Sequence, residues 1–447
     1  MDSIYIRESE HYSKKYLIDL LGQSVHDKLL NQAVITYDAV NDTYQFNYVG
    51  VIIIDEMVIN CYPKYIHEKS SIHDDFKQVI NVIKRYESTC EDDAYEDIET
   101  DNLTSNMLPM MLFFVEDYYE NGVYTKIHSI LEDNGDGEID WNRTVNKDQS
   151  IVINDKAYYT HLQTKRKLND LYDYYRLLHE YIITDCSNYL EKNELLHLFD
   201  LTPVEISDNH LDDFGKLDFI LNKLDKQQNI EFNTHKQKLL KVMHSYLSKN
   251  NLFNDENTLL LYGTRTYHDV WEKVCKHVLK DKLDKKLSKL HLPCQLNDKY
   301  NPSYELIKVI KKPTWILKDK HPRKTDTFIP DIVAIKDDQF IILDAKYYDL
   351  TTDKNISGQP GLESITKEYL YELAFKEFTE DNAFKTIKNA FLFPTEKSEV
   401  NNLGIVKLDI LSLLGLQDIQ LIMLPANLVY EHYLDNTKMN ISHLKLE

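Results

Sequence analysis

The stretch PDIVAIKDDQFIILDAK, residues 330–346, decides the fold of the C-terminal third of this chain. Residues 328–335 and 340–343 are apolar and largely β-branched, which is typical of buried β-strands. The polar residues 336–338 between them are typical of a turn. The stretch therefore predicts a β-hairpin made of two buried strands.

Two acidic side chains stand at the same end of this predicted hairpin. Asp331 comes early in the first strand and Asp344 comes late in the second, so antiparallel pairing brings their carboxylates together. Lys346 shares a face with Asp344 because side chains alternate along a strand. Two carboxylates and the Ala345 carbonyl are hard oxygen ligands that suit Mg²⁺, and a metal-bound water near Lys346 could attack phosphorus. The pattern predicts a metal-dependent phosphodiesterase.

A structural alternative stays open for these residues. Acids and lysines at strand ends are usually solvated, and a spacing such as that of Asp331, Asp344 and Lys346 also arises by chance in acidic chains. The catalytic interpretation is favoured because both acids are embedded in strands that otherwise look buried. An unpaired charge is costly in such surroundings.

Residues 330–331 (PD) and 344–348 (DAKYY) together resemble the signature of the PD-(D/E)xK nuclease superfamily. They are most similar to the form in LlaJI-type and McrC-type restriction nucleases, where aromatic residues follow the lysine. The resemblance implies an endodeoxyribonuclease of a bacterial phage-defence system that cuts double-stranded DNA with Mg²⁺, or with Mn²⁺ in its place. Asp331, Asp344 and the Ala345 carbonyl are then the metal ligands. Lys346 is then the catalytic lysine.

Residues 262–264 (YGT) and 270–275 (VWEKVC) are similar to the helix that opens the nuclease domain in that family. Apolar residues from Val270 to Val278 form one helical stripe, which predicts a buried helix. Glu272 falls beside the stripe and matches an additional acid that many such nucleases place near the metal. The alternative is an ion pair with Lys276, one turn later, on a solvated face.

Residues 363–378 (ESITKEYLYELAFKEF) predict an amphipathic helix after the hairpin, and residues 389–394 (NAFLFP) predict another strand of the same sheet. Members of the family often carry a glutamine in this helix that touches the lysine or the DNA. This chain has no glutamine there, and Glu372 stands nearest to its place. The role of the helix therefore stays open.

Residues 48–54 (YVGVIII) and 58–66 (VINCYPKYI) are similar to the opening β-rich segment of McrC-type subunits. That segment binds a ring-shaped AAA+ motor in those proteins, so the resemblance implies an McrB-like AAA+ hexamer as partner of the N-terminal region. The alternative is an ordinary β-hairpin without a partner. Because the sequence has no Gly-x-x-x-x-Gly-Lys-Ser/Thr pattern, nucleotide hydrolysis would come from a separate subunit.

The net charge of −21 is unfavourable for binding DNA phosphates. Residues 273–330, however, hold 15 Lys or Arg against 6 Asp or Glu, a local charge of +9 directly before Asp331. The lysines from Lys282 to Lys289 are at helical spacing, so a solvated helix face is the alternative to a DNA-binding patch. The predicted DNA-binding residues are Lys282, Lys285, Lys286, Lys318, Lys320, Arg323 and Lys324.

The 447 residues suffice for two or three domains. We expect a multidomain α+β or α/β protein. Residues 1–75 are predicted to be a β-rich partner-binding segment, residues 76–250 a mainly helical region, and residues 251–447 a PD-(D/E)xK nuclease domain with a mixed sheet flanked by helices. Helices are expected at 75–86, 103–120, 165–199 and 232–252, with a turn-rich connection at 131–141.

Five scattered cysteines without a Cys-x-x-Cys pair indicate neither a zinc site nor a disulfide framework, and they are typical of a reducing cytoplasm. No signal peptide is recognisable, and no apolar run is long enough to cross a bilayer. We therefore expect a cytoplasmic protein without membrane contact.

Three functional classes remain open. The first is a nuclease subunit that works with a separate AAA+ motor in phage restriction. The second is a self-sufficient type II restriction enzyme, and the third is a non-catalytic adaptor that binds DNA or stimulates the motor. The intact Asp331, Asp344 and Lys346 argue against the third class, and the first is favoured.

Overall fold

The computed structural model describes residues 3–54, 57–68, 70–91, 106–250, 259–316, 318, 323–324, 327, 329–351 and 356–447. The chain divides into two compact units. The larger combines residues 1–95 with residues 261–447, and the smaller comprises residues 96–260. Segments from both ends of the sequence therefore build one unit, and all predicted site residues belong to it.

A mixed β-sheet forms the centre of the larger unit. Its strands are β14 (Ile332–Lys336), β15 (Gln339–Ala345), β16 (Thr386–Thr395), β18 (Ile419–Pro425) and β17 (Asn401–Val406), in that spatial order. The pair β14–β15 is antiparallel, as the sequence predicts, with Asp337 of the turn at a φ of 53°. The strands β15, β16 and β18 run parallel, and β17 is antiparallel to β18. The apolar runs of the parallel strands fit a sheet covered on both faces.

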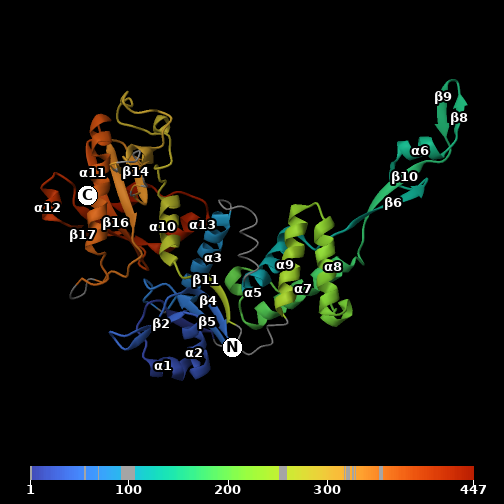
Figure 1. Ribbon diagram of the computed structural model, residues 1–447, viewed down its shortest axis with the longest axis horizontal. Coiled ribbons are helices and arrows are strands. Elements are labelled where there is room, and N and C mark those ends of the chain that lie inside the picture. The colour runs from blue at the N-terminus through green and yellow to red at the C-terminus, as the bar shows by residue number, and fades with distance from the viewer. Residues whose placement is uncertain are drawn as a thin grey trace. The chain divides into compact units, whose positions relative to one another are not determined.

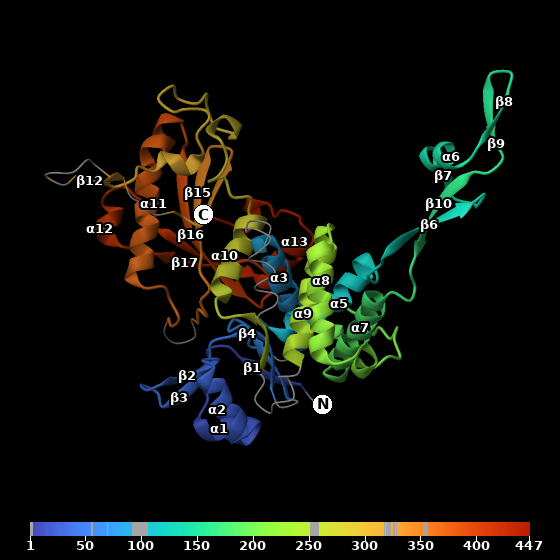
Figure 2. The same cartoon turned by 45° about the vertical axis from the view of Figure 1, so that its right-hand side comes forward.

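Helices cover both faces of this sheet (Figures 1 and 2). The helix α11 (Leu362–Asp381) contacts β15, β16 and β18 on one face. On the other face, α10 (Tyr267–Val278) contacts β15 and α13 (Ala426–Leu434) contacts β18. The predicted stripe of α10 is buried from Val270 to Val278, and the Trp271 indole N–H donates to the Leu392 carbonyl of β16 at 3.2 Å. The predicted helices and strands around the hairpin are thus confirmed, but α11 is not amphipathic as predicted, because Leu370 and Leu373 are exposed whereas Glu368 and Glu372 are buried.

A second sheet of the larger unit runs in the order β1 (Ile4–Arg7), β5 (Met57–Tyr62), β4 (Val49–Ile54) and β11 (Leu259–Thr264). The antiparallel pair β4–β5 confirms the predicted hairpin, and β4 is buried along its whole length. The N-terminal region also contains the helices α1 (Lys14–Leu21) and α2 (Gln23–Asn31), which the sequence patterns did not reveal, and the hairpin β2 (Ile35–Asp38) to β3 (Thr43–Phe46). The helix α3 (Ile72–Glu91) follows and packs on α10 and α13.

The smaller unit contains helices and a β-structured extension. The helices are α5 (Met107–Asn121), α7 (Tyr174–Lys192), α8 (Leu217–Ile230) and α9 (Thr234–Asn250). The extension consists of β6 (Ile127–Asp133), β7 (Glu138–Ile139), α6 (Trp141–Lys147), β8 (Ser150–Ile153), β9 (Lys156–Tyr159) and β10 (Gln163–Asn169). Within this unit the hairpin β8–β9 lies beyond the end of β6 and β10 that points away from the helices (Figures 1 and 2).

Two predictions for the smaller unit are wrong. Residues 165–169 do not begin a helix, because they belong to β10 and pair with β6. The helix begins at Tyr174, where the Asp173 carboxylate accepts the N–H groups of Tyr175 and Arg176 and so caps the first turn. The expected turn-rich connection at 131–141 contains the end of β6 and the whole of β7.

Short elements complete the described part of the chain. They are η1 (His197–Phe199), η2 (Leu211–Phe214), η3 (Leu287–Lys289), η4 (Leu306–Val309), β12 (Thr314–Trp315), β13 (Arg323–Lys324), α12 (Asp409–Ser412) and η5 (Ile441–Leu444). None of the described helices combines the length and the apolar composition that a bilayer span requires.

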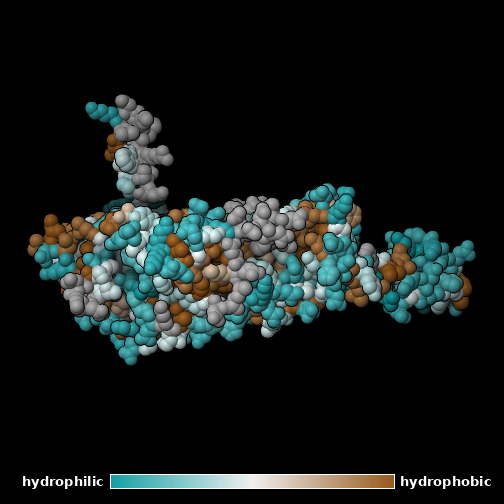
Figure 3. All heavy atoms as spheres, turned by 90° about the horizontal axis from the view of Figure 1, so that it is seen from below, coloured by the Kyte–Doolittle hydropathy of each residue, from teal (hydrophilic) through white to brown (hydrophobic). Residues whose placement is uncertain are grey.

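Hydrophobic side chains also reach the surface in places. On the face shown in Figure 3, hydrophobic residues lie in patches among hydrophilic ones. The hairpin β8–β9 of the smaller unit exposes Ile151, Val152, Ile153 and Tyr158. Contiguous exposed apolar side chains often mark a surface that another molecule covers.

Two glycines bring the backbones of β4 and β11 into close approach. Gly50 and Gly263 have φ values of +144° and +147°. A Cβ on Gly50 would lie 2.2 Å from the Tyr262 carbonyl oxygen, and a Cβ on Gly263 would lie 2.2 Å from that of Val49. The pairing of the two strands therefore requires glycine at both positions.

We expect Gly50→Ala to destabilise the larger unit by about 1–3 kcal/mol, because the side chain strains the backbone and pushes β11 away. The measurement is the thermal midpoint followed by circular dichroism. Gly361→Ala is the matched control, since no atom would lie within 4 Å of its Cβ. Equal midpoints for the two variants would contradict the close approach.

Candidate active site

The register of β14 and β15 places the two predicted acids opposite each other. Ile332 pairs with Leu343 and Val333 with Ile342, so the next pair along the ladder is Asp331 and Asp344. Asp331 precedes β14 rather than lying early in it, which corrects the prediction. Its Oδ2 accepts the Ala345 N–H at 2.9 Å, so a side-chain hydrogen bond extends the hairpin where the backbone ladder stops.

Lys346 completes this constellation. Its Nζ lies 2.7 Å from Oδ2 of Asp344, and the exposed fractions of the two side chains are 18% and 5%. The two residues thus lie on one side of the hairpin, as side-chain alternation predicts. The Lys346 N–H donates to the Leu392 carbonyl at 2.9 Å, so β16 fixes the backbone at this position.

The acids and the lysine perturb one another. Burial, a hydrogen bond with Asp344 and the charge of that carboxylate raise the pKa of Asp331 well above its ordinary value. Burial alone would lower the pKa of Lys346, but the charges of Asp344, Asp331 and Glu272 outweigh burial and raise it. Lys346 is therefore a charged ammonium near neutral pH, whereas the raised pKa of Asp331 favours the neutral form of that carboxyl.

Glu272 lies near the same cluster. Burial, followed by the charge of Asp344, raises its pKa, whereas Lys346 acts in the opposite direction. The alternative partner, Lys276, pairs instead with Asp281, with 3.3 Å between Nζ and Oδ2. The structure therefore associates Glu272 with the aspartates rather than with a solvated ion pair.

A buried acid that the sequence analysis did not select faces the cluster from α11. Glu368 is fully buried, and neither of its carboxylate oxygens has a hydrogen-bond partner among the described residues. Burial and the charges of Asp344 and Asp331 raise its pKa well above the ordinary value. The signal in the sequence was an acid at helical spacing from Tyr371, Phe375 and Phe378, which places it on the buried side of the helix, where a charge is costly.

Glu372, which stands nearest to the place of the family glutamine, has a different role. Its Oε2 accepts the Asn389 amide at 2.5 Å and the Gln417 N–H at 2.9 Å. These bonds join α11 to β16 and to the loop before β18. Glu368, one turn earlier, is affected by the charges of Asp331 and Asp344, as is Tyr371 of the same helix.

The donor set can be compared with the needs of a metal ion. Among the residues that the structure describes, no three side chains of His, Cys, Asp or Glu gather as a metal-binding group. Mg²⁺ commonly takes only one or two carboxylates and keeps several waters. Asp331 and Asp344, with the Ala345 carbonyl, satisfy this need. The acids at this end of the sheet also exceed Lys346 in number, which favours a divalent cation.

The N-terminal region fixes the residues that follow the lysine. The Tyr347 hydroxyl donates to the carboxylate of Glu8, which is buried. Asp349 accepts from Arg7 at 2.8 Å and lies 2.9 Å from Nε2 of His67. Residues from the first 70 positions thus support the backbone beside the site.

The predicted DNA-binding residues do not form one helix face. Between Lys282 and Lys289 only η3 is helical, so the predicted helical spacing is wrong. Lys282 and Lys285 line a pocket of about 550 Å³, whereas Lys286 is exposed outside it. Lys318 is exposed, and Lys320 lies outside the described residues. Arg323 and Lys324 form β13, but their side chains are not described.

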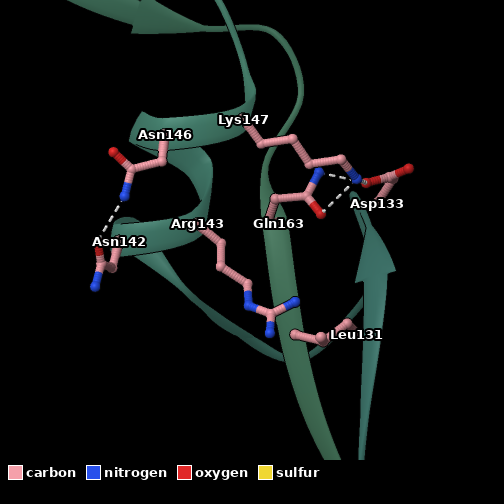
Figure 4. Close-up of a pocket in the computed structure, with 7 residues that line it drawn as sticks. All are labelled: Leu131, Asp133, Asn142, Arg143, Asn146, Lys147 and Gln163. Carbon is pink, nitrogen blue, oxygen red and sulfur yellow. Dashed lines mark hydrogen bonds and ion pairs between the residues drawn. The ribbon is translucent and has the colours of Figure 1, made fainter.

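Another pocket, of about 560 Å³, belongs to the extension of the smaller unit and contains none of the predicted site residues (Figure 4). Its polar groups bind one another. Lys147 donates to the Gln163 side chain at 3.2 Å, and Gln163 donates to Asp148 at 3.1 Å and to Asp133. These contacts stabilise α6 against β10.

We expect Glu368→Gln to stabilise the metal-free protein increasingly as pH rises. Below the ordinary carboxyl pKa the group is protonated in both states; above it, ionisation favours the unfolded state, because the native pKa is raised. Thermal midpoints in a chelator at about pH 4.5 and about pH 8 measure the effect.

The matched control is Glu363→Gln in the same helix. Lys367 lies 2.7 Å from the Glu363 carboxylate and lowers its pKa, so this substitution should not stabilise the protein at high pH. A gain for Glu368→Gln that does not grow with pH would argue against a raised native pKa.

Comparison with known proteins gives three similarities. The family model described as LlaJI restriction endonuclease matches residues 48–427. The chain is 28% identical over 459 residues to the type II restriction enzyme BsuMI component YdjA of Bacillus subtilis (strain 168), covering 99% of this chain and 91% of that protein.

The third similarity is to a solved structure, a refined half-complex from a tetradecameric assembly of Thermococcus gammatolerans McrB AAA+ hexamers with bound McrC. It has a TM-score of 0.37 and 11% identity and covers 97% of this chain and 100% of that one. The family match extends over most of the sequence, from β4 to the start of α13. The chain therefore belongs to the LlaJI restriction endonuclease family and is a nuclease of a restriction system.

Proposed function

We propose that this chain is the DNA-cleaving subunit of its restriction system and hydrolyses phosphodiester bonds with Mg²⁺ at a PD-(D/E)xK site. The observation that carries the proposal is the hairpin β14–β15, which holds Asp331 opposite Asp344 with Lys346 at 2.7 Å. A sheet in which this antiparallel pair is followed by parallel strands, with helices on both faces, supports the assignment.

Each residue of the site has a role in this proposal. Asp331, Asp344 and the Ala345 carbonyl hold the ion, and Glu272 adds negative charge beside them. When bound, Mg²⁺ supplies an acidified water and offsets charge on the scissile phosphate. Lys346 orients the nucleophile and balances developing charge; its raised pKa argues against removal of a proton from water.

Substitution of one predicted ligand tests the site. We expect Asp344→Asn to reduce DNA cleavage at least about 100-fold with little change in thermal midpoint, because it removes a metal ligand. The measurement is Mg²⁺-dependent plasmid cleavage, made with the AAA+ protein and nucleotide present if the chain alone is inactive, and a chelator should abolish cleavage by the wild type.

Asp337→Asn in the turn of the same hairpin is the matched control. It makes the same charge change at an exposed position with positive φ, which asparagine tolerates. Cleavage by Asp344→Asn at the rate of the wild type would refute the assignment.

We also propose that a separate AAA+ motor supplies nucleotide hydrolysis, because the sequence lacks a P-loop. The relative from Bacillus subtilis is described as one component of its enzyme, which supports an assembly of several chains. The strands β4 and β5 are largely buried, so a partner of the N-terminal region would contact α1, α2 or the exposed Tyr37 and Val40 near β2–β3.

Reconstitution separates this proposal from a self-sufficient type II enzyme. We expect the purified chain with Mg²⁺ to leave plasmid intact, and to cut it once the AAA+ protein of the same system and a hydrolysable nucleotide are added. Cleavage by the chain alone, unchanged by the motor, would favour the self-sufficient enzyme. Full restriction of phage by Asp344→Asn in cells would favour a non-catalytic adaptor.

A further inference from the structure

A basic pocket of about 550 Å³ lies at the C-terminal end of α10. Five lysines line it, namely Lys276, Lys280, Lys282, Lys285 and Lys438. They come from the last turns of α10, from the loop after it and from the segment after α13. The sequence separates Lys438 from the others by more than 150 positions, so only the fold gathers this charge.

The two aspartates of the pocket, Asp281 and Asp284, interact with neighbouring groups of the protein. Asp281 accepts the N–H groups of Val333 at 2.9 Å and Leu283 at 3.2 Å, and its other oxygen lies 3.3 Å from Lys276. Asp284 is also nearest to Lys276, at 3.7 Å. Among the described residues, the other four lysines have no carboxylate partner.

The cations of the pocket repel one another. Burial lowers the pKa of Lys438, and the charges of Arg85 and Lys280 lower it further. The pKa of His277 is lowered by burial and then by Lys438 and Arg85. An anion in the pocket would offset this repulsion, so the charge pattern is that of an anion-binding site.

The pocket adjoins the candidate active site along two elements. On α10, Lys276 follows Glu272 by one turn, and residues four apart lie on one helix face. The loop after α10 is bonded to β14, because the Lys282 N–H donates to the Val333 carbonyl at 2.9 Å and Asp281 accepts the Val333 N–H. Val333 lies two positions after Asp331.

We propose that this pocket binds a backbone phosphate of the DNA beside the scissile one and thereby positions the strand over Asp331 and Asp344. The inference rests on the proposed nuclease function. Flexible lysines recognise a phosphate as point charges and carry no sequence information, so the contact fixes register rather than specificity. Because the net charge of the chain is acidic, locally basic sites such as this pocket are the favourable places for the DNA backbone.

A pair of double variants tests the pocket. Lys280→Ala/Lys285→Ala removes two pocket lysines, whereas the control Lys216→Ala/Lys226→Ala removes two exposed lysines of the smaller unit that lie outside the pocket. Both are made in the Asp344→Asn background, so that DNA binds without being cut. Binding of a fluorescent duplex is measured by anisotropy over a range of salt concentrations. The protein is used in whichever form cleaves plasmid, either the chain alone or the chain with its AAA+ motor.

We expect the pocket variant to bind duplex at least about 10-fold more weakly, and its slope of log affinity against log salt to fall by about 0.9 for each DNA phosphate that the variant no longer neutralises. The control should keep the affinity and the slope of the parent. Equal weakening of both variants would show a diffuse basic surface, and unchanged binding by the pocket variant would show that DNA does not enter. Either result would contradict the proposal that the pocket binds a DNA phosphate. Plasmid cleavage by the wild type would still support the proposed nuclease function.

Failure of the nuclease itself has a different signature. If the wild type neither binds duplex nor cuts plasmid, the proposed function falls and this inference with it. Thermal midpoints of both double variants should match the parent, since the substituted side chains lie at the surface and their ammonium groups pair with no described carboxylate.

Discussion

The hydrogen bond from the Ala345 N–H to the Asp331 carboxylate is the contact on which the site depends. It continues the β14–β15 ladder by one residue and fixes Asp331 opposite Asp344. A slip of one residue in this pairing would turn the acids to opposite faces of the sheet. The apolar pairs Ile332–Leu343 and Val333–Ile342 are buried on the two covered faces of the sheet, so a slip would disrupt their packing on both faces.

This arrangement brings several carboxylates together at a buried site, and their burial and mutual repulsion oppose folding. Asp331, Glu272 and Glu368 all have raised pKa values, and burial is the largest cause in each case. Packing around the site offsets the cost. Phe340 and Ile342 of β15 lie in one apolar cluster with Tyr371, Phe375 and Phe378 of α11. The bonds of Tyr347 and Asp349 to the N-terminal segment hold the chain on the other side of the lysine.

The sign of the local charge changes along α10. At the level of Glu272 the surroundings are acidic and suit a cation, whereas one turn later Lys276 begins a basic pocket that suits an anion. A phosphodiester chain that must meet both a metal ion and its own compensating cations needs both environments close together. The net charge of the whole chain, which is acidic, does not reveal this separation of acidic and basic regions.

The sequence alone determined the hairpin, the stripe of α10, the helix after the hairpin and the presence of Asp331, Asp344 and Lys346 at one strand end. These features follow from local periodicity and from the alternation of side chains, which need no knowledge of distant residues. It predicted a helix from residue 165 wrongly, because pairing of β10 with β6 overrides local preference. It also assigned a helix face to Lys282 through Lys289 that does not exist.

Only the tertiary structure decided the remainder. Glu368 lies near Asp331 and Asp344 because α11 packs on the face of β15 that carries Asp344. Glu372 instead accepts hydrogen bonds from Asn389 and Gln417. Lys438 reaches the pocket of Lys280 because the segment after α13 returns to the end of α10, where the Met439 N–H donates to the Val278 carbonyl. Burial and charge at a site are sums over residues that lie far apart in the sequence, so no local pattern contains them.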